Sequence, residues 1–139
     1  MKLIFICKHN VFRSRVAEEY FKKTNKDPKI KVISRGLIMG GQSDPAQREI
    51  AKKLLGIKIE GRKPVPLTLP ELIGADLVIV VANDIPSVVF DYQRITIEKK
   101  VVIWNIKDEQ LQNKENIKRT ILSIKEKVDQ LNKKLEKKR

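Results

Sequence analysis

The sequence predicts an α/β fold, a doubly wound, four-stranded parallel sheet with helices on both faces. Three observations support this prediction. Short apolar segments of strand length alternate with amphipathic segments of helix length, which is the pattern of βαβ units. The apolar segments are continuous, as expected of strands that are buried on both faces of a parallel sheet. The 139 residues contain no internal repeat and no linker, so we expect one domain over residues 1–139.

The first strand and the first helix flank the most informative segment of the chain. The apolar run Lys2–Ile6 predicts a buried strand, and Ser14–Thr24 predicts an amphipathic helix. The expected buried stripe of this helix is Val16, Ala17, Tyr20 and Phe21, and its expected outer side is Glu18, Glu19, Lys22 and Lys23.

The other elements follow in alternation. A second helix is expected to start at Ser43-Asp44-Pro45, where a capping residue precedes a proline, and to end at Leu55 before Gly56. The β-branched run Asp76–Val81 is the clearest strand. The remaining expected elements are strands at Ile30–Ser34 and Val101–Trp104, short helices at Leu69–Ile73 and Ile85–Asp91, and a long helix at about Lys114–Glu136.

The long C-terminal helix carries an apolar stripe with helical spacing. We expect this stripe to pack on the sheet, and a dimer seam is the alternative. The oligomeric state is therefore left open. The stripe consists of Ile117, Ile121, Ile124, Val128, Leu131 and Leu135.

Composition limits the partners and the compartment. The net charge of +13 would suit a nucleic acid partner, but much of it lies at the C-terminus and no familiar nucleic-acid module is present, so an anionic substrate is favoured. A single cysteine excludes an intrachain disulfide and indicates a reducing compartment. The longest apolar run, Leu77–Ala82, is far shorter than the roughly 20 residues of a membrane span, and no signal peptide is recognised. We therefore expect a cytoplasmic protein with no membrane partner.

The lone cysteine, Cys7, lies in a loop between the first strand and the first helix. Arg13 follows it after five residues, and Ser14 comes next. Backbone amides of such a loop converge on an anion, and the helix directs its positive end toward the same place. An arginine fork binds two phosphate oxygens, and the same field favours a cysteine thiolate. A buried core cysteine is the simpler reading of Cys7 alone, but the spacing of Arg13 and Ser14 favours a nucleophile directed at phosphorus.

The segment ICKHNVFRS followed by RVAEEYF resembles the opening signature of the low-molecular-weight protein tyrosine phosphatases and of their thioredoxin-coupled arsenate reductase relatives. Other segments are similar as well. Ile33–Gly36 resembles the family's second strand, the stretch from Gly56 to Thr68 resembles its middle loop, and ADLVIVVAND, ending at Asp84, resembles its third strand. The likeness covers roughly the first 110 residues.

The resemblance implies a flavodoxin-like sheet with the cysteine loop at the carboxyl end of the first strand, where ligands bind in open α/β sheets. It implies two-step hydrolysis of a phosphate monoester, such as a phosphotyrosine protein or a small aryl phosphate, with no metal and no other cofactor. Cys7 would be the nucleophile and form a cysteinyl-phosphate, Arg13 would hold the phosphate oxygens, and Asp108 would act as acid and base. The implied substrate-binding residues are Lys8, His9, Asn10, Val11, Phe12 and Ser14, with Ser14 donating to the thiolate and Asn10 bracing the loop.

The chain departs from the family pattern at several positions. Asp108 is followed by Glu109 where the family usually has proline, which leaves Asp84 and Asp91 as rival acids. His9 stands where the family has glycine, so its side chain is expected to alter the phosphate cradle. Phe12 replaces a second cysteine, so an oxidised Cys7 would have no resolving thiol next to it.

Two other functions stay open. Arsenate reduction on the same scaffold needs a further thiol, which an external thiol would have to supply. A non-catalytic protein that binds anions or nucleic acid would keep the loop without turnover. Lys8 and Arg35 would suit a basic rim, although plain surface charge is the simpler account, and Arg62 and Lys63 are expected in an exposed loop.

Overall fold

A computed structural model of the chain describes residues 1–86, 89–90, 100–107 and 113–137. The strands are β1 (Lys2–Cys7), β2 (Lys31–Gly36), β3 (Leu77–Val80) and β4 (Val101–Ile103), and all pair in parallel in the order β2-β1-β3-β4. The helices are α1 (Arg13–Thr24), α2 (Pro45–Leu55), α3 (Leu69–Gly74) and α5 (Lys114–Lys137).

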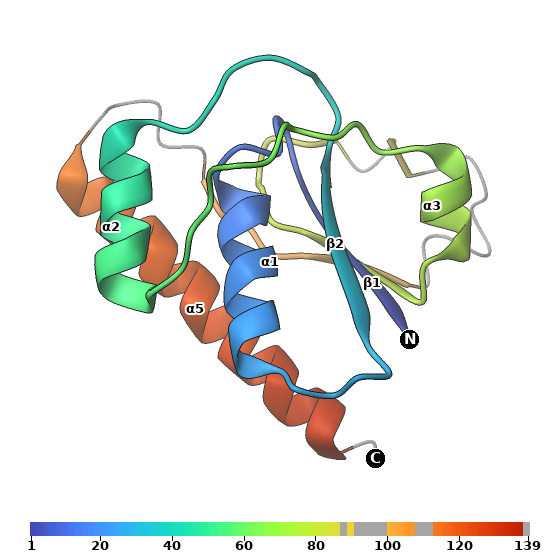
Figure 1. The fold of residues 1–139 in the computed structure, drawn as a ribbon. Coiled ribbons are helices and arrows are strands. Elements are labelled where there is room, and N and C mark those ends of the chain that lie inside the picture. Colours follow the sequence, from blue (N-terminus) through green and yellow to red (C-terminus); the bar gives the residue numbers. More distant parts are fainter. Residues whose placement is uncertain (87–88, 91–99, 108–112, 138–139) are drawn as a thin grey trace.

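The sheet lies between two layers of helix (Figure 1). The helices α1, α2 and α5 cover one face, and α3 covers the other. The predicted doubly wound α/β fold is therefore confirmed. The expected strands and helices agree with the observed ones to within one or two residues at each end, except that the expected helix Ile85–Asp91 falls partly outside the described residues.

The alternation of side chains along β1 divides the core in two. Leu3 and Phe5 face α1, α2 and α5, whereas Ile4 and Ile6 face the side covered by α3. The ring of Phe5 packs against Phe21 of α1, with centroids 6.0 Å apart. Because β1 is buried on both faces, its run of apolar residues is continuous, as the sequence indicated.

The apolar stripe of α5 is buried against the same core as α1 and α2, so the packing prediction is confirmed. A polar contact adds to it, because Tyr20 Oη donates to Asp129 Oδ1 at 2.7 Å. Burial and this bond to Asp129 raise the pKa of Tyr20 above its usual value, which keeps the hydroxyl a donor.

The chain reverses its direction of winding between β1 and β3. From β1 it passes through α1 to β2 on one side, and from β2 it crosses back over β1 to β3 on the other side. The connections that leave the carboxyl ends of β1 and β3 therefore run in opposite directions. Open α/β sheets hold their ligands at such a point. No helix among the described residues is long and apolar enough to cross a membrane.

Candidate active site

Cys7 is the last residue of β1 and is almost fully buried, with 2% of its surface exposed. Two hydrogen-bonding groups contact its sulfur. The backbone N–H of Asn10 donates to Sγ at 3.3 Å, and Ser14 Oγ lies 3.0 Å from Sγ. Donors in these positions stabilise a negatively charged sulfur.

Asn10 fixes the conformation of the loop that follows Cys7. Its φ of 58° lies in the left-handed region, which asparagine tolerates better than most residues. Its Nδ2 donates to Ser14 Oγ at 2.8 Å and to Ser34 Oγ at 2.9 Å, and its Oδ1 accepts from the backbone N–H of Val65 at 3.1 Å. The side chain of Asn10 therefore ties the loop to α1, to β2 and to the segment before α3.

The hydroxyl of Ser14 is held beside the sulfur, because Ser14 Oγ accepts from Asn10 Nδ2 at 2.8 Å. When Cys7 is a thiolate it has no proton to donate, so Ser14 is then the donor and the sulfur the acceptor. This hydrogen bond favours the thiolate.

The backbone of the loop lies close to the end of β2. The carbonyl oxygen of Lys8 accepts from the N–H groups of Leu37 and Ile38, each at 2.9 Å. A Cβ atom on Gly36 would come within 2.9 Å of the backbone carbon of His9, so only glycine fits there. This close approach explains the glycine at the end of β2.

His9 does not strain the loop as its place in the family pattern suggested. Among the described non-glycine residues only Asn10 has a positive φ, so the left-handed residue of the loop is Asn10 and not His9. The imidazole of His9 instead lies against the segment after β2, with Nδ1 2.9 Å from the carbonyl oxygen of Ile38. The backbone at position 9 therefore does not need the left-handed freedom of glycine, and the expected effect of the His9 side chain on the cradle stays a prediction.

Arg13 begins α1 and is buried, with 4% of its surface exposed. Its Nη1 donates to the carbonyl oxygen of Ile106 at 2.9 Å and to Asp84 Oδ1 at 3.2 Å, and its Nη2 lies 3.4 Å from Asp84 Oδ2. Asp84 follows β3 and Ile106 follows β4. The guanidinium of Arg13 is therefore held at the carboxyl edge of the sheet by residues that follow two neighbouring strands.

The start of α1 is suited to an anion. The residue before the helix, Phe12, has no side-chain oxygen with which to cap the first amides, and the first turn contains no acidic residue. The unpaired N–H groups of a helix start and its positive dipole end attract negative charge. The loop from Cys7 to Arg13 therefore has the features of a phosphate cradle.

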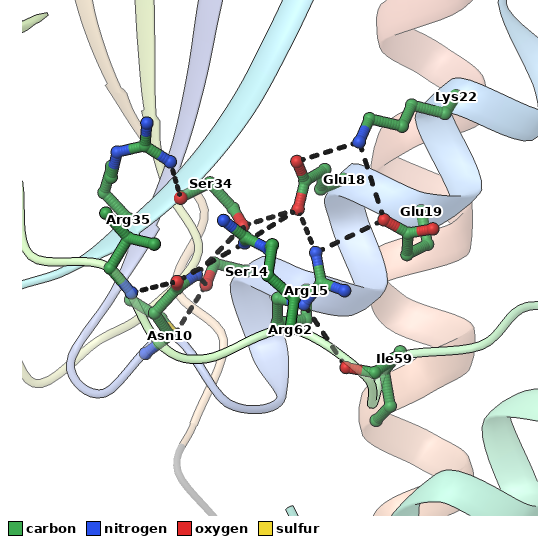
Figure 2. Close-up of polar contacts among 12 residues, drawn as sticks. Asn10, Ser14, Arg15, Glu18, Glu19, Lys22, Ser34, Arg35, Ile59 and Arg62 are labelled. Atoms are coloured by element: carbon green, nitrogen blue, oxygen red, sulfur yellow. Dashed lines mark hydrogen bonds and ion pairs between the residues drawn. The ribbon is translucent and has the colours of Figure 1, made fainter. Parts of the chain in front are cut away.

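A second polar cluster stands behind the loop and is centred on Glu18 (Figure 2). Glu18 Oε1 accepts from Ser34 Oγ at 2.7 Å, from Arg62 Nη2 at 3.2 Å and from Arg15 Nη1. Arg62 Nη2 also donates to Ser34 Oγ at 2.8 Å and lies 3.5 Å from Asn10 Oδ1. The cluster is therefore continuous with the bonds that fix the loop.

One sequence expectation is corrected here. Glu18 was expected on the outer side of the first helix, but only 3% of its surface is exposed, because Arg15, Ser34 and Arg62 surround its carboxylate. Arg62 lies in an exposed loop, as expected, and its guanidinium also reaches this buried carboxylate. The spacing along the chain was a weak indication of this position. Glu18 lies four residues after Ser14, so both are on the side of α1 that faces the loop.

The positive charges around Glu18 keep its carboxyl group ionised. Burial acts to raise the pKa of Glu18, but the hydrogen bond from Ser34 and the positive charges of Lys22, Arg15 and Arg62 outweigh it and hold the pKa below its usual value. Burial also lowers the pKa of Arg62, although the charge of Glu18 opposes this shift. Glu18 is therefore an anion that stabilises the cluster.

We expect Glu18→Gln to lower the free energy of unfolding at neutral pH by about 3 kcal/mol, because it leaves buried guanidinium charge without its carboxylate. The folded-state pKa of Glu18 lies below the ordinary 4.5, so its stabilisation is complete above that pH and is lost as the pH falls through the folded-state value. Urea unfolding at several pH values measures both effects.

Glu19→Gln is the matched control, since Glu19 is the next residue of α1, also contacts Arg15 and Lys22, and has 25% of its side chain exposed. A loss below about 1 kcal/mol is expected there. Equal losses in the two variants, or a gap between the parent and Glu18→Gln that widens below pH 4.5, would contradict this role of Glu18.

The remaining sequence-predicted residues are placed as follows. Val11 and Phe12 are half-buried in the loop, and Phe12 packs on the core that faces α1. Asp108 and Asp91 lie outside the described residues. Arg35 does not form a basic rim with Lys8, because it pairs with Glu71 of α3 at 2.8 Å. Within the described part of the chain, no group of three or more His, Cys, Asp or Glu residues could hold a metal ion.

Comparisons with known proteins agree with this geometry. A tyrosine phosphatase from T. tengcongensis is 26% identical, with a TM-score of 0.80 over 96% of this chain and 99% of that one. A protein tyrosine phosphatase from Entamoeba histolytica is 22% identical, with a TM-score of 0.84 over 99% and 97%. An arginine phosphatase from Geobacillus stearothermophilus is 17% identical, with a TM-score of 0.80 over 99% and 94%.

No curated protein matches the sequence significantly. The model of one family does, and it covers residues 2–139, from the first strand to the end of the last helix. Over nearly the same range the fold agrees with that of the solved phosphatases. The chain belongs to the low molecular weight phosphotyrosine protein phosphatase family and is a hydrolase of that type.

Proposed function

We propose that the protein hydrolyses phosphate monoesters, with phosphotyrosine as the substrate class, through a cysteinyl-phosphate intermediate. The observation that carries the proposal is the environment of Cys7. As a thiolate, its sulfur accepts from Ser14 Oγ and from the N–H of Asn10. It also lies beside the start of α1, which no side chain caps. A thiolate stabilised in this way is a nucleophile, and the same loop attracts the phosphate to it.

In the first step the Cys7 thiolate attacks phosphorus. A bond forms between Sγ and phosphorus, and the bond from phosphorus to the leaving oxygen breaks. Arg13 and the loop amides hold the equatorial oxygens of phosphorus, and Asp108 donates a proton to the leaving oxygen. The product alcohol departs and the phosphate stays on the cysteine.

In the second step a water molecule attacks phosphorus. Asp108, now a carboxylate, takes the proton of that water, and the bond from phosphorus to Sγ breaks. Inorganic phosphate leaves and the thiolate returns, stabilised again by Ser14 and Asn10. Neither step uses a metal ion or another cofactor.

The other residues of the loop have supporting roles in this proposal. Lys8, His9, Val11 and Phe12 contribute backbone to the cradle, with Asn10 as its brace. Asp84, the rival acid, contacts both terminal guanidinium nitrogens of Arg13, so we assign it the positioning of Arg13. Support for Asp108 is its place in the chain, two residues after Ile106, whose carbonyl binds Arg13.

The two alternatives have less support. Arsenate reduction requires a thiol from outside the chain, because Cys7 is its only cysteine. A protein that only binds anions would not need the alignment of Ser14 with the sulfur. The family match and the solved phosphatases favour hydrolysis.

A generic aryl phosphate tests the proposed function. We expect hydrolysis from mildly acid to neutral pH and competitive inhibition by vanadate, an analogue of the pentacoordinate transition state. A peptide with phosphoarginine serves as the comparison, since some of the similar structures are named arginine phosphatases. Turnover of that peptide without turnover of the aryl phosphate would contradict the monoester assignment.

Asp108→Asn tests the proposed acid. A poor leaving group needs its proton more than a good one, so we expect turnover of phenyl phosphate to fall by about 10²-fold or more and that of para-nitrophenyl phosphate to fall less. The measurement is kcat for the two substrates in the parent and the variant.

Asp84→Asn is the comparison for Asp108→Asn. Because Asp84 acts through Arg13, its substitution is expected to slow both substrates by the same factor. A leaving-group effect that follows Asp84 rather than Asp108 would contradict the assignment.

A further inference from the structure

A cavity of about 510 Å³ opens beside the phosphate loop, a volume within the range of small-ligand pockets. Residues of the loop, of the segment before α2 and of the segment before α3 surround it. Arg48, Arg62 and Lys63 contribute its positive charge, and Glu60 contributes a negative one. The proposed hydrolysis of a monoester leaves this cavity without a role.

The cavity adjoins the phosphate cradle. Asn10 and Val11 line it, and both belong to the loop between Cys7 and Arg13. The segment that carries Arg62 and Lys63 is tied to the same loop, because the N–H of Val65 donates to Asn10 Oδ1 at 3.1 Å. A group in this cavity would therefore lie next to a phosphate in the loop.

Positive charge exceeds negative charge around the cavity. Glu60 Oε2 lies 3.4 Å from Arg48 Nε, and Glu18 is shared between Arg62, Arg15 and Lys22. Lys63 is exposed and forms no ion pair with any described residue. One cation of the cavity is thus free to bind an anion from solution.

The charges around Arg62 agree with the excess of positive charge at the cavity. Burial and the nearby charges of Arg15 and Arg35 lower its pKa, and Glu18 opposes them. A further anion near Arg62 would relieve the repulsion between these guanidinium groups.

We propose that this cavity is a second anion subsite, which binds the carboxylate of an acidic residue next to the phosphorylated residue of a protein substrate. The inference rests on the proposed phosphatase function and names the kind of substrate that the site prefers. A pair of this sort at a partly exposed site contributes modestly, so we expect a preference of about two- to fivefold rather than absolute selection.

Two phosphotyrosine peptides test the subsite, one with glutamate and the other with glutamine at the positions that flank the phosphotyrosine. The quantity measured is the ratio of kcat/KM for the acidic peptide to that for the neutral one, at low ionic strength. We expect a ratio of about two to five in the parent, a ratio near one in Lys63→Gln and a reversed preference in Lys63→Glu. Added salt should bring the ratio of the parent toward one.

Lys29→Gln is the control for net charge. Lys29 is exposed and precedes β2, so it lies at the edge of the sheet opposite the phosphate loop, and its variant should keep the ratio of the parent. A ratio near one in the parent, with both peptides hydrolysed, would overturn the subsite and leave the proposed function intact. A fall in the ratio that is equal in Lys63→Gln and Lys29→Gln would also overturn it. If neither peptide and no aryl phosphate is hydrolysed, the proposed function is overturned, and the subsite with it.

Discussion

Cys7→Ser is expected to abolish phosphatase activity, with kcat reduced by about 10⁴-fold or more, while the variant still binds phosphate and vanadate. A serine hydroxyl in this position is far less nucleophilic than a thiolate, and its neighbours supply no base, because Ser14 and the N–H of Asn10 both donate toward it. The cradle for the phosphate oxygens does not depend on the sulfur, since Asn10 holds the loop through other atoms.

The measurement pairs turnover of an aryl phosphate with the affinity for vanadate measured by calorimetry. Ser123→Ala is a suitable control, because Ser123 is exposed on α5, far along the chain from the loop. Turnover by Cys7→Ser close to that of the parent would contradict a cysteine nucleophile. Loss of both turnover and oxyanion binding would contradict the separation of the cradle from the nucleophile.

Arg13→Lys is expected to lower kcat by about 10²- to 10³-fold, although the charge is kept. The guanidinium is held at two points, by Asp84 and by the carbonyl oxygen of Ile106, and its planar fork can present two donors to a phosphate. A lysine ammonium is a single point of charge and cannot keep both anchors and also bind two oxygens of the transition state.

Steady-state kinetics with an aryl phosphate measure this loss, and Arg119→Lys is the matched control. Arg119 is exposed on α5, so the same substitution there should leave kcat unchanged. A kcat for Arg13→Lys close to that of the parent would show that charge alone is sufficient and would contradict the bidentate role.

The fold was predictable because its signals are local. The runs Leu3–Ile6 and Leu77–Val81 are continuous and apolar, and such runs are typical of buried parallel strands. The loop at Cys7 was predictable for a similar reason, since the cysteine, the arginine and the helix start lie within eight residues.

The support behind the loop was not predictable, because it depends on residues that meet only in the folded chain. Glu18 is followed directly by a second glutamate, so the sequence predicts a solvated residue, and its burial follows only from the approach of Ser34 and Arg62. Likewise the need for glycine at position 36 comes from the backbone of His9, which lies in another element. The assignment of Asp108 still rests on sequence alone.

The bonds of Asn10 have a thermodynamic consequence. The left-handed conformation at this residue is unfavourable by itself, and four contacts to Ser14, Ser34, Val65 and Arg62 maintain it. None of these contacts requires a ligand, so the loop is ordered when the protein folds and not when phosphate arrives. The conformational entropy of the cradle is lost when the protein folds. Phosphate binding therefore does not have to order the loop, and its affinity is not reduced by that loss of entropy.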